Sequence, residues 1–222
     1  LRTVTGVQTC ALPISDIDKT TPVVDVKQAA VVGAGTMGGG IAMCFADSGI
    51  PVKLLEISQE FLDAGMAKIK ANYETSIKRG SLTADGMAER LALIDPVIEY
   101  EAIADADMVI EAVFEEMPVK EEVFAKLDAV MKDGAIMASN TSTLDIDQIA
   151  RATKRPESVL GMHFFSPANV MKLLEIVRGE KSSKEAVATA LRVARRIGKV
   201  GAVCGNCDGF LANRSRMPFQ TE

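Results

Sequence analysis

The stretch Ala29-Ala-Val-Val-Gly33-Ala-Gly35-Thr-Met-Gly38 decides the fold of this chain. Its four leading apolar residues predict a short buried strand, and its glycines have the G-x-G-x-x-G spacing of a turn that opens a helix. Gly33 would form the tight turn, Gly35 would let a pyrophosphate approach the backbone, and Gly38 would let helix and strand pack closely. The stretch therefore predicts a dinucleotide-binding strand, turn and helix.

The second part of this fingerprint is an acidic residue at the end of the next strand. Val52 to Leu55 is an apolar run that ends at Glu56, about twenty residues after the turn. A carboxylate there accepts the ribose hydroxyls and repels a 2′-phosphate, which favours NAD over NADP. We also expect Thr36 and Met37 to contact the cofactor, because a helix N-terminus directs free N–H groups at phosphates. A glycine-rich turn of another α/β domain is the alternative, whereas a P-loop would need Gly-Lys-Ser/Thr after the glycines.

Composition excludes several classes of protein. The chain has 222 residues, with 25 basic and 30 acidic side chains and a formal net charge of −5. The acidic balance argues against nucleic acid as the main partner. Four cysteines in a chain of this length do not make a disulfide framework, so we expect a reducing, cytoplasmic compartment. The uncharged stretch 28–46 contains five glycines, which argues against a membrane span.

Short apolar runs alternate with helical periods along the chain. This alternation predicts an α/β fold of the Rossmann type, with a mostly parallel, doubly wound sheet and helices on both faces. Two helix starts are also expected: a capping box of Ser182 with Glu185, and an N-cap at Ser142 or Thr143. The expected strands are 29–32, 52–55, 108–113, 135–139, 159–165, 173–177 and 200–203, and the expected helices lie around 41–48, 62–77, 118–130, 146–149 and 185–197.

The one histidine of the chain is a candidate catalytic base. His163 lies between apolar neighbours, where a core histidine with satisfied hydrogen bonds is the simpler interpretation. Glu175 lies inside another apolar run, 173–177, and a buried carboxylate is costly unless it is paired. Adjacent strands could bring the two side chains together, and a carboxylate beside an imidazole fixes its tautomer. That pair would form a general base able to take a hydroxyl proton.

Polar residues follow the strand 135–139. Asn140, Ser142 and Thr143 stand at the carboxyl end of that strand, which is the edge where ligands bind in open α/β sheets. Such a cluster suits a nicotinamide or a substrate oxygen.

Other chemistries find less support in the sequence. A short-chain dehydrogenase needs Tyr-x-x-x-Lys, but Ile77 stands four positions after Tyr73 and Ala104 stands four positions after Tyr100. We expect no metal site, because one histidine and a single Cys204-x-x-Cys207 pair do not provide a ligand set. Two buried thiols are the simpler interpretation of that pair, and a redox CxxC is the alternative.

From about Gln28 to Arg214 the chain resembles the NAD-binding domain of 3-hydroxyacyl-CoA dehydrogenases. The sequence around His163 is most similar to that of the multifunctional β-oxidation enzymes, which fuse an enoyl-CoA hydratase to the dehydrogenase. Ser166 is a residue that those members often carry. The stretches that carry the resemblance are Gly33-Ala-Gly-Thr-Met-Gly-Gly-Gly40, Val109-Ile-Glu-Ala-Val-Phe-Glu-Glu116, Ala138-Ser-Asn-Thr-Ser-Thr143, His163-Phe-Phe-Ser-Pro-Ala-Asn-Val-Met-Lys-Leu-Leu-Glu175 and Asp208-Gly-Phe-Leu-Ala-Asn213.

The resemblance implies a role for each matching position. His163 would be the catalytic base and Glu175 its electrostatic partner. Ser142 would bind the 3-oxygen of the substrate and help to place the nicotinamide, and Asn213 would complete the active site. The implied reaction is NAD-dependent oxidation of 3-hydroxyacyl-CoA to 3-ketoacyl-CoA in fatty acid β-oxidation. The alternative is an NAD-binding fragment, or a non-catalytic homologue of the same fold, without turnover.

The resemblance also implies ligand contacts and partners. Glu115, Lys120 and Asn140 would contact NAD beside the glycine turn. The acyl-CoA substrate would contact the long second helix, and the parent enzyme would be a homodimer or part of a multifunctional complex. The candidates for CoA contacts are Lys68, Asn72, Lys78 and Arg79.

Four segments are expected along the chain. Residues 1–15 resemble the translation of a sequencing-library adaptor and are expected to be non-native, and 16–27 is expected to be a linker. Residues 28–207 would form the NAD-binding Rossmann domain. Residues 208–222 would begin the helical C-terminal domain of the family, the rest of which is missing here, so the chain is expected to be a fragment.

Overall fold

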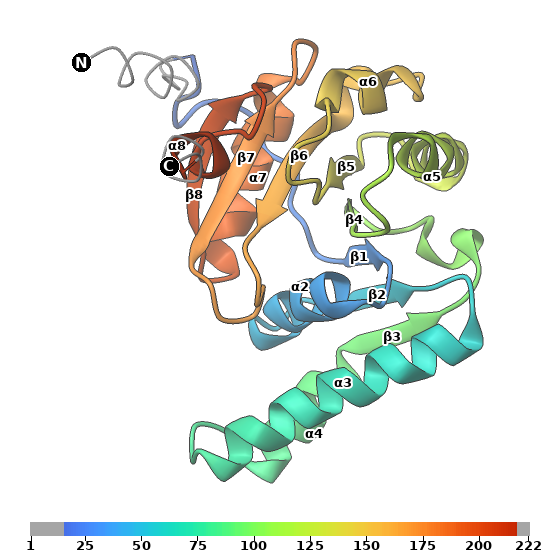
Figure 1. The fold of residues 1–222 in the computed structure, drawn as a ribbon, viewed down its shortest axis with the longest axis vertical. Coiled ribbons are helices and arrows are strands. Elements are labelled where there is room, and N and C mark those ends of the chain that lie inside the picture. Colours follow the sequence, from blue (N-terminus) through green and yellow to red (C-terminus); the bar gives the residue numbers. More distant parts are fainter. Residues whose placement is uncertain (1–15, 217–222) are drawn as a thin grey trace.

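The computed structural model describes residues 16–216, which form one eight-stranded sheet covered by helices (Figure 1). The segment expected to derive from an adaptor, 1–15, and the last residues of the expected C-terminal segment, 217–222, lie outside the described residues. The strands are β1 (Ala29–Val32), β2 (Val52–Leu55), β3 (Ile94–Val97), β4 (Met108–Glu111), β5 (Ile136–Ser139), β6 (Val159–Phe164), β7 (Leu173–Arg178) and β8 (Val200–Gly205).

The helices connect the strands as an α/β fold requires. The α-helices are α2 (Thr36–Asp47), α3 (Gln59–Lys78), α4 (Ala84–Ala92), α5 (Met117–Val130), α6 (Ile146–Arg151), α7 (Lys184–Arg196) and α8 (Ala212–Arg216), with two short 3₁₀ helices, η1 (Tyr100–Ile103) and η2 (Pro156–Ser158).

The sheet confirms the predicted fold class. Its strand order is β3-β2-β1-β4-β5-β6-β7-β8, and every neighbouring pair is parallel except β6 and β7. The strands β1, β4 and β5 are buried along their whole length, because helices cover both faces of the sheet. Side chains of α2, α3 and α7 pack in one core cluster, and those of α5 and α6 pack in a second cluster.

Several elements differ from the sequence-based expectations. Helix α4 and strand β3 were not predicted; β3 is an edge strand whose Asp95 and Pro96 break the apolar pattern. Strand β4 ends at Glu111, two residues before the expected end at Val113. Cys204 is buried as expected, but Cys207 is only half-buried.

Both expected helix caps were misplaced by one to three residues. Helix α7 is capped by Ser183, whose side chain accepts a hydrogen bond from the N–H of Ala186. Ser182 is buried instead, and its hydroxyl donates to the carbonyl of Val159 at 2.6 Å. Helix α6 is capped by Asp145 rather than by Ser142 or Thr143.

The segment 16–27 contains no helix or strand, but it packs on the domain. Val26 is buried, and its carbonyl accepts a hydrogen bond of 2.7 Å from the guanidinium of Arg196 on α7. The N–H of Val24 donates to the hydroxyl of Thr189 on the same helix at 2.9 Å. The segment is therefore attached along α7.

Candidate active site

The glycine turn between β1 and α2 has the geometry that the sequence predicted. Gly33 has a φ of +100°, and a Cβ there would lie 2.7 Å from the carbonyl oxygen of Ala112. A Cβ on Gly38 would collide with the carbonyl oxygen of Gly33. A Cβ on Gly35 would meet nothing within 4 Å, so the turn is open to a ligand on that side. Helix α2 also has no side-chain cap and no acidic residue in its first turn, which suits an anionic pyrophosphate.

Glu56 lies beside this turn. One carboxylate oxygen accepts a hydrogen bond from the N–H of Ala34 at 3.0 Å, and the other accepts from the N–H of Ile57 at 2.9 Å. The glycine turn and the end of β2 are thereby joined through one acidic side chain. Each carboxylate oxygen retains a second lone pair, which leaves acceptors for ribose hydroxyls.

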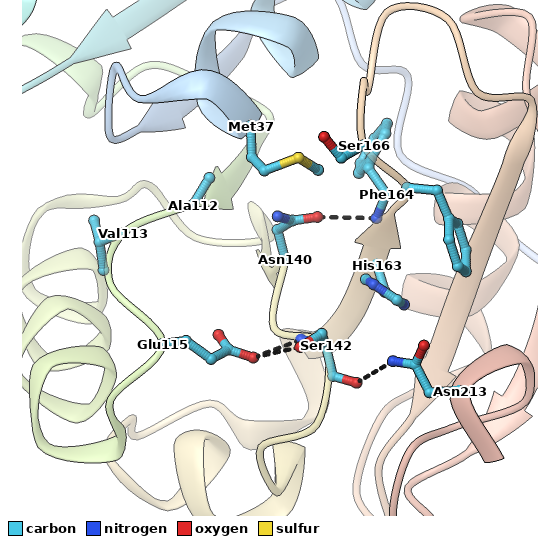
Figure 2. Close-up of a pocket in the computed structure, with 11 residues that line it drawn as sticks. Met37, Ala112, Val113, Glu115, Asn140, Ser142, His163, Phe164, Ser166 and Asn213 are labelled. Atoms are coloured by element: carbon cyan, nitrogen blue, oxygen red, sulfur yellow. Dashed lines mark hydrogen bonds between the residues drawn. The ribbon is translucent and has the colours of Figure 1, made fainter. Parts of the chain in front are cut away.

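A pocket of about 400 Å³ opens at the carboxyl ends of β1, β4, β5 and β6 (Figure 2). This is the edge of an open α/β sheet at which ligands bind. The lining residues include six that the sequence singled out. They are Met37, Glu115, Asn140, Ser142, His163 and Asn213.

His163 and Glu175 form a direct pair. They face each other in the register of the antiparallel strands β6 and β7, and His163 Nδ1 lies 2.7 Å from Glu175 Oε2. The Glu175 side chain is completely buried, and its Oε1 accepts hydrogen bonds from the N–H groups of Leu211 and Ala212 at 3.0 and 2.7 Å. The same carboxylate therefore holds the imidazole and the segment that begins α8.

Glu115 organises the opposite wall of the pocket. Its Oε1 accepts hydrogen bonds from the N–H of Ser142 at 2.6 Å and from the Ser142 hydroxyl at 3.1 Å (Figure 2). The same oxygen accepts a hydrogen bond of 2.7 Å from the Thr141 hydroxyl. Burial alone would raise the pKa of Glu115, but these donors and the nearby Lys120 ammonium outweigh it and hold the pKa below its usual value. Glu115 is consequently a carboxylate at neutral pH.

Two amide side chains fix the loops around Ser142. Asn213 Nδ2 donates to the carbonyl of Ser142 at 3.3 Å, and Asn140 Oδ1 accepts from the N–H of Phe164 at 2.9 Å. Figure 2 shows Ser142, His163 and Asn213 around the same part of the pocket. The structure thus gathers residues from β6, α8 and the loop after β5.

The sequence reasoning missed Glu111, which is completely buried at the end of β4. It forms an ion pair of 2.7 Å with Lys120, whose side chain is only 1% exposed. Lys120 was expected to contact NAD, but it does not line the pocket and lies behind Glu115, 3.3 Å from its Oε2. The missed signal was a carboxylate within an apolar strand, the same signal that identified Glu175.

The residues expected to contact CoA do not line the pocket. Three of them occupy exposed positions on α3, and Arg79 is exposed at its C-cap. Asn72 alone approaches α2, with its Nδ2 at 3.8 Å from the sulfur of Met43. The exposed residues are Lys68, Asn72, Lys78 and Arg79.

Residues 16–216 contain neither a candidate metal site nor a membrane-spanning helix. No group of three or more histidine, cysteine or acidic residues in this range could hold a metal ion. No helix in this range has the length and apolar character needed to cross a membrane.

Comparison with known proteins identifies the family. A family model described as "3-hydroxyacyl-CoA dehydrogenase, NAD binding domain" matches residues 28–207. Fatty acid oxidation complex subunit alpha of Pseudomonas putida is 46% identical over 195 residues, which cover 88% of this chain and 27% of that protein. The subunit of the same name from Psychrobacter cryohalolentis is 45% identical, with the same coverage. The chain therefore spans about a quarter of the length of these curated relatives.

A solved structure agrees with the sequence relatives. The 3-hydroxybutyryl-CoA dehydrogenase of Escherichia coli K12 superposes with a TM-score of 0.86 and 39% identity, over 88% of this chain and 42% of that one. The family model, which matches residues 28–207, covers all eight strands and the glycine turn. The chain therefore belongs to the family of 3-hydroxyacyl-CoA dehydrogenase NAD-binding domains, and NAD is the cofactor of this domain.

Proposed function

We propose that the protein to which this domain belongs oxidises 3-hydroxyacyl-CoA to 3-ketoacyl-CoA with NAD, as a step of fatty acid β-oxidation. The observation that carries the proposal is the His163–Glu175 pair of 2.7 Å, on the wall of a pocket that Ser142 and Asn213 also line. The names of the relatives, a fatty acid oxidation complex subunit and a 3-hydroxybutyryl-CoA dehydrogenase, agree with this reaction.

The pair gives His163 the tautomer of a general base. Glu175 is a carboxylate acceptor at Nδ1, so neutral His163 carries its proton on Nδ1 and presents the lone pair of Nε2 to a ligand. Nε2 takes the proton of the substrate 3-hydroxyl as the C3–O bond becomes a carbonyl. Glu175 then stabilises the imidazolium, whose second proton is on Nε2.

Bound NAD would supply the oxidant of this reaction, as the acceptor of a hydride from C3 of the substrate. The glycine turn and α2 would bind its pyrophosphate, and Glu56 would bind a ribose. Glu115 and Asn140 would lie along the path from the turn to His163, since both line the pocket. Ser142 would contact the 3-oxygen, with Asn213 fixing its backbone. Lys120 would act through Glu115 rather than by direct contact.

We also propose where the substrate binds and in which surroundings the enzyme works. The CoA portion of the substrate would extend along the exposed face of α3, where Lys68, Asn72 and Arg79 are candidate contacts. We place the reaction in the cytoplasm, in keeping with the low cysteine content. The first relatives are subunits of a complex, and we propose an acyl-CoA-metabolising complex or homodimer for the parent enzyme.

Steady-state oxidation of a 3-hydroxyacyl-CoA, followed by NADH absorbance, tests this function in the longer protein that contains the domain. We expect turnover with NAD that is lost in His163→Gln while NAD binding persists. NAD binding by the wild-type protein without any turnover would instead identify a binding domain without catalysis, which is the alternative function.

A further inference from the structure

Glu111 is a buried acidic residue to which the proposed mechanism gives no part. Its side chain is completely buried at the end of β4, where an ionised carboxylate is costly unless it is paired and hydrogen-bonded. Its Oε1 accepts hydrogen bonds from Lys120 Nζ at 2.7 Å and from the N–H of Val113 at 2.7 Å. Its Oε2 accepts from the hydroxyl of Ser139 at 2.6 Å. Both oxygens thus accept hydrogen bonds, from the segment that follows β4, from α5 and from β5.

Two chains of contacts lead from Glu111 to the loop after β5, one to Ser142 and the other to its neighbour Thr141. Along the first, Lys120 Nζ lies 3.3 Å from Glu115 Oε2, and Glu115 Oε1 accepts from the N–H and hydroxyl of Ser142. Along the second, the Ser139 hydroxyl accepts a hydrogen bond of 3.2 Å from the N–H of Thr141. Glu111 is where the two chains meet, since it binds Lys120 and Ser139 at once.

The charges make this arrangement sensitive to Glu111. Lys120 is a single buried ammonium shared by two carboxylates, Glu111 and Glu115. If Glu111 lost its charge, the ammonium would be attracted to Glu115 alone. Glu115 would then form a closer ion pair with Lys120 and would weaken its hydrogen bonds to the Ser142 loop.

We propose that Glu111 is a positioning residue, which fixes Glu115 and the Ser142 loop through Lys120 and Ser139 and thereby sets the affinity of the domain for NAD. Glu111 and Ser139 are both completely buried, so neither acts by direct contact with the cofactor. This inference rests on the proposed function, in which Glu115 and Ser142 lie beside the bound cofactor.

Titration calorimetry with NAD on this chain tests the proposal with two variants. Glu111→Gln keeps the shape and removes the charge, and Ser139→Ala removes one hydroxyl without changing any charge. We expect each variant to bind NAD about three- to tenfold more weakly than the wild type, because each loosens a charge-assisted hydrogen bond that fixes the site. The titrations are run well below the melting temperature of every variant.

A matched control comes from the same helix. Lys126 and Glu122 form an exposed ion pair of 2.7 Å on α5, and Glu122→Gln removes its charge without touching the pocket. We expect this variant to bind NAD like the wild type, since exposed pairs contribute little.

The outcomes separate a positioning role from a purely structural one. A structural role predicts lower melting temperatures for Glu111→Gln and Ser139→Ala with unchanged NAD affinity of the folded protein, and that result would overturn the proposal. If Glu111→Gln cannot be obtained folded, Ser139→Ala decides alone: weaker NAD binding supports the proposal and unchanged binding overturns it. A wild-type chain that binds no NAD would contradict the proposed function as well.

Discussion

At the scale of single residues, buried carboxylates organise this site. Glu175 accepts three hydrogen bonds, one from the imidazole of His163 and two from the backbone at the start of α8. Glu111 also accepts three, although it lies outside the pocket. A buried carboxylate whose two oxygens are both hydrogen-bonded holds the groups that donate to it in place. Precise placement of a base and its substrate is a large part of enzymatic rate.

The His163–Glu175 pair should carry most of the chemical step in the longer enzyme. His163→Gln removes the base and should lower kcat by about two to four powers of ten, the usual contribution of a general base. Glu175→Gln keeps the side-chain shape but cannot stabilise the imidazolium as a carboxylate does, so kcat should fall by at least about tenfold. NADH absorbance measures both rates.

The affinity for NAD is the control for this prediction. The Kd of both variants should stay within about threefold of the wild type, because neither residue takes part in the proposed cofactor contacts. Turnover of His163→Gln at a near-normal rate would show that His163 is a core residue and not the base.

Glu56 should make the domain prefer NAD to NADP. The carboxylate sits at the glycine turn, hydrogen-bonded to Ala34 and Ile57, where a 2′-phosphate would meet its negative charge. We expect NAD to bind at least about tenfold more tightly than NADP, and Glu56→Gln to reduce that ratio. Calorimetric titration of this chain with both cofactors measures it; equal affinities in the wild type would contradict the prediction.

At the scale of elements, the sequence predicted best what is most buried. Apolar runs located β1, β2 and β5 to within one residue, and the buried Glu175 pointed to its partner on the adjacent strand. Edge strand β3 was not predicted because its two middle residues, Asp95 and Pro96, are both exposed and interrupt the apolar pattern. Helix α4 was not predicted for a related reason, since none of its residues is buried and it adds nothing to the core.

Pairing between loops was also beyond prediction. Glu115 contacts Thr141, 26 residues away, and Ser142, 27 residues away. These contacts depend on which strands are neighbours in the sheet. Local patterns give the elements, whereas such contacts follow only from the order of strands in the sheet. For the same reason the sequence could not predict that Lys120 is buried behind Glu115, because lysine side chains are usually exposed.

Asp107 links the residues just before β1 to Lys132, which follows α5. Its carboxylate accepts hydrogen bonds from the N–H groups of Lys27 and Gln28, at 2.7 and 2.9 Å, and from Lys132 Nζ at 2.6 Å. Burial alone would raise the pKa of Asp107, but the Lys132 ammonium and the two N–H groups outweigh it and lower the pKa from 3.8. Asp107→Asn should therefore reduce the free energy of unfolding at neutral pH by about 1–2 kcal/mol.

The pH dependence of this effect has a definite sign. A depressed pKa means that the stabilisation by ionised Asp107 is complete above its unfolded pKa, and is lost as the pH falls from 3.8 through the lower folded value. Urea unfolding of wild type and Asp107→Asn should differ at pH 7 and converge in acid. A difference that persisted unchanged at low pH would show that the charge is not its cause.

At the scale of the whole molecule, residues 16–27 behave as part of the domain in spite of their loop-like sequence. They cross α7, contacting Thr189 and Arg196, and they bury Val26 before the chain enters β1. The segment expected to be a linker is therefore bound to α7. This attachment would fix the point at which any domain joined to the segment begins.

Two truncations of this chain test how far the folded unit extends. Removing residues 1–15, which resemble adaptor-derived sequence, should leave the melting temperature unchanged within about a degree. Removing 1–27 also removes the buried Val26 side chain and the bonds to Thr189 and Arg196, a loss of about 3 kcal/mol. That loss should lower the melting temperature by about 6–12 °C in a chain of this size. Calorimetry on both truncations separates the contributions of the two segments. Equal melting temperatures of the two truncations would show that residues 16–27 contribute nothing to stability. A melting temperature that falls when 1–15 alone are removed would show that these residues belong to the folded unit.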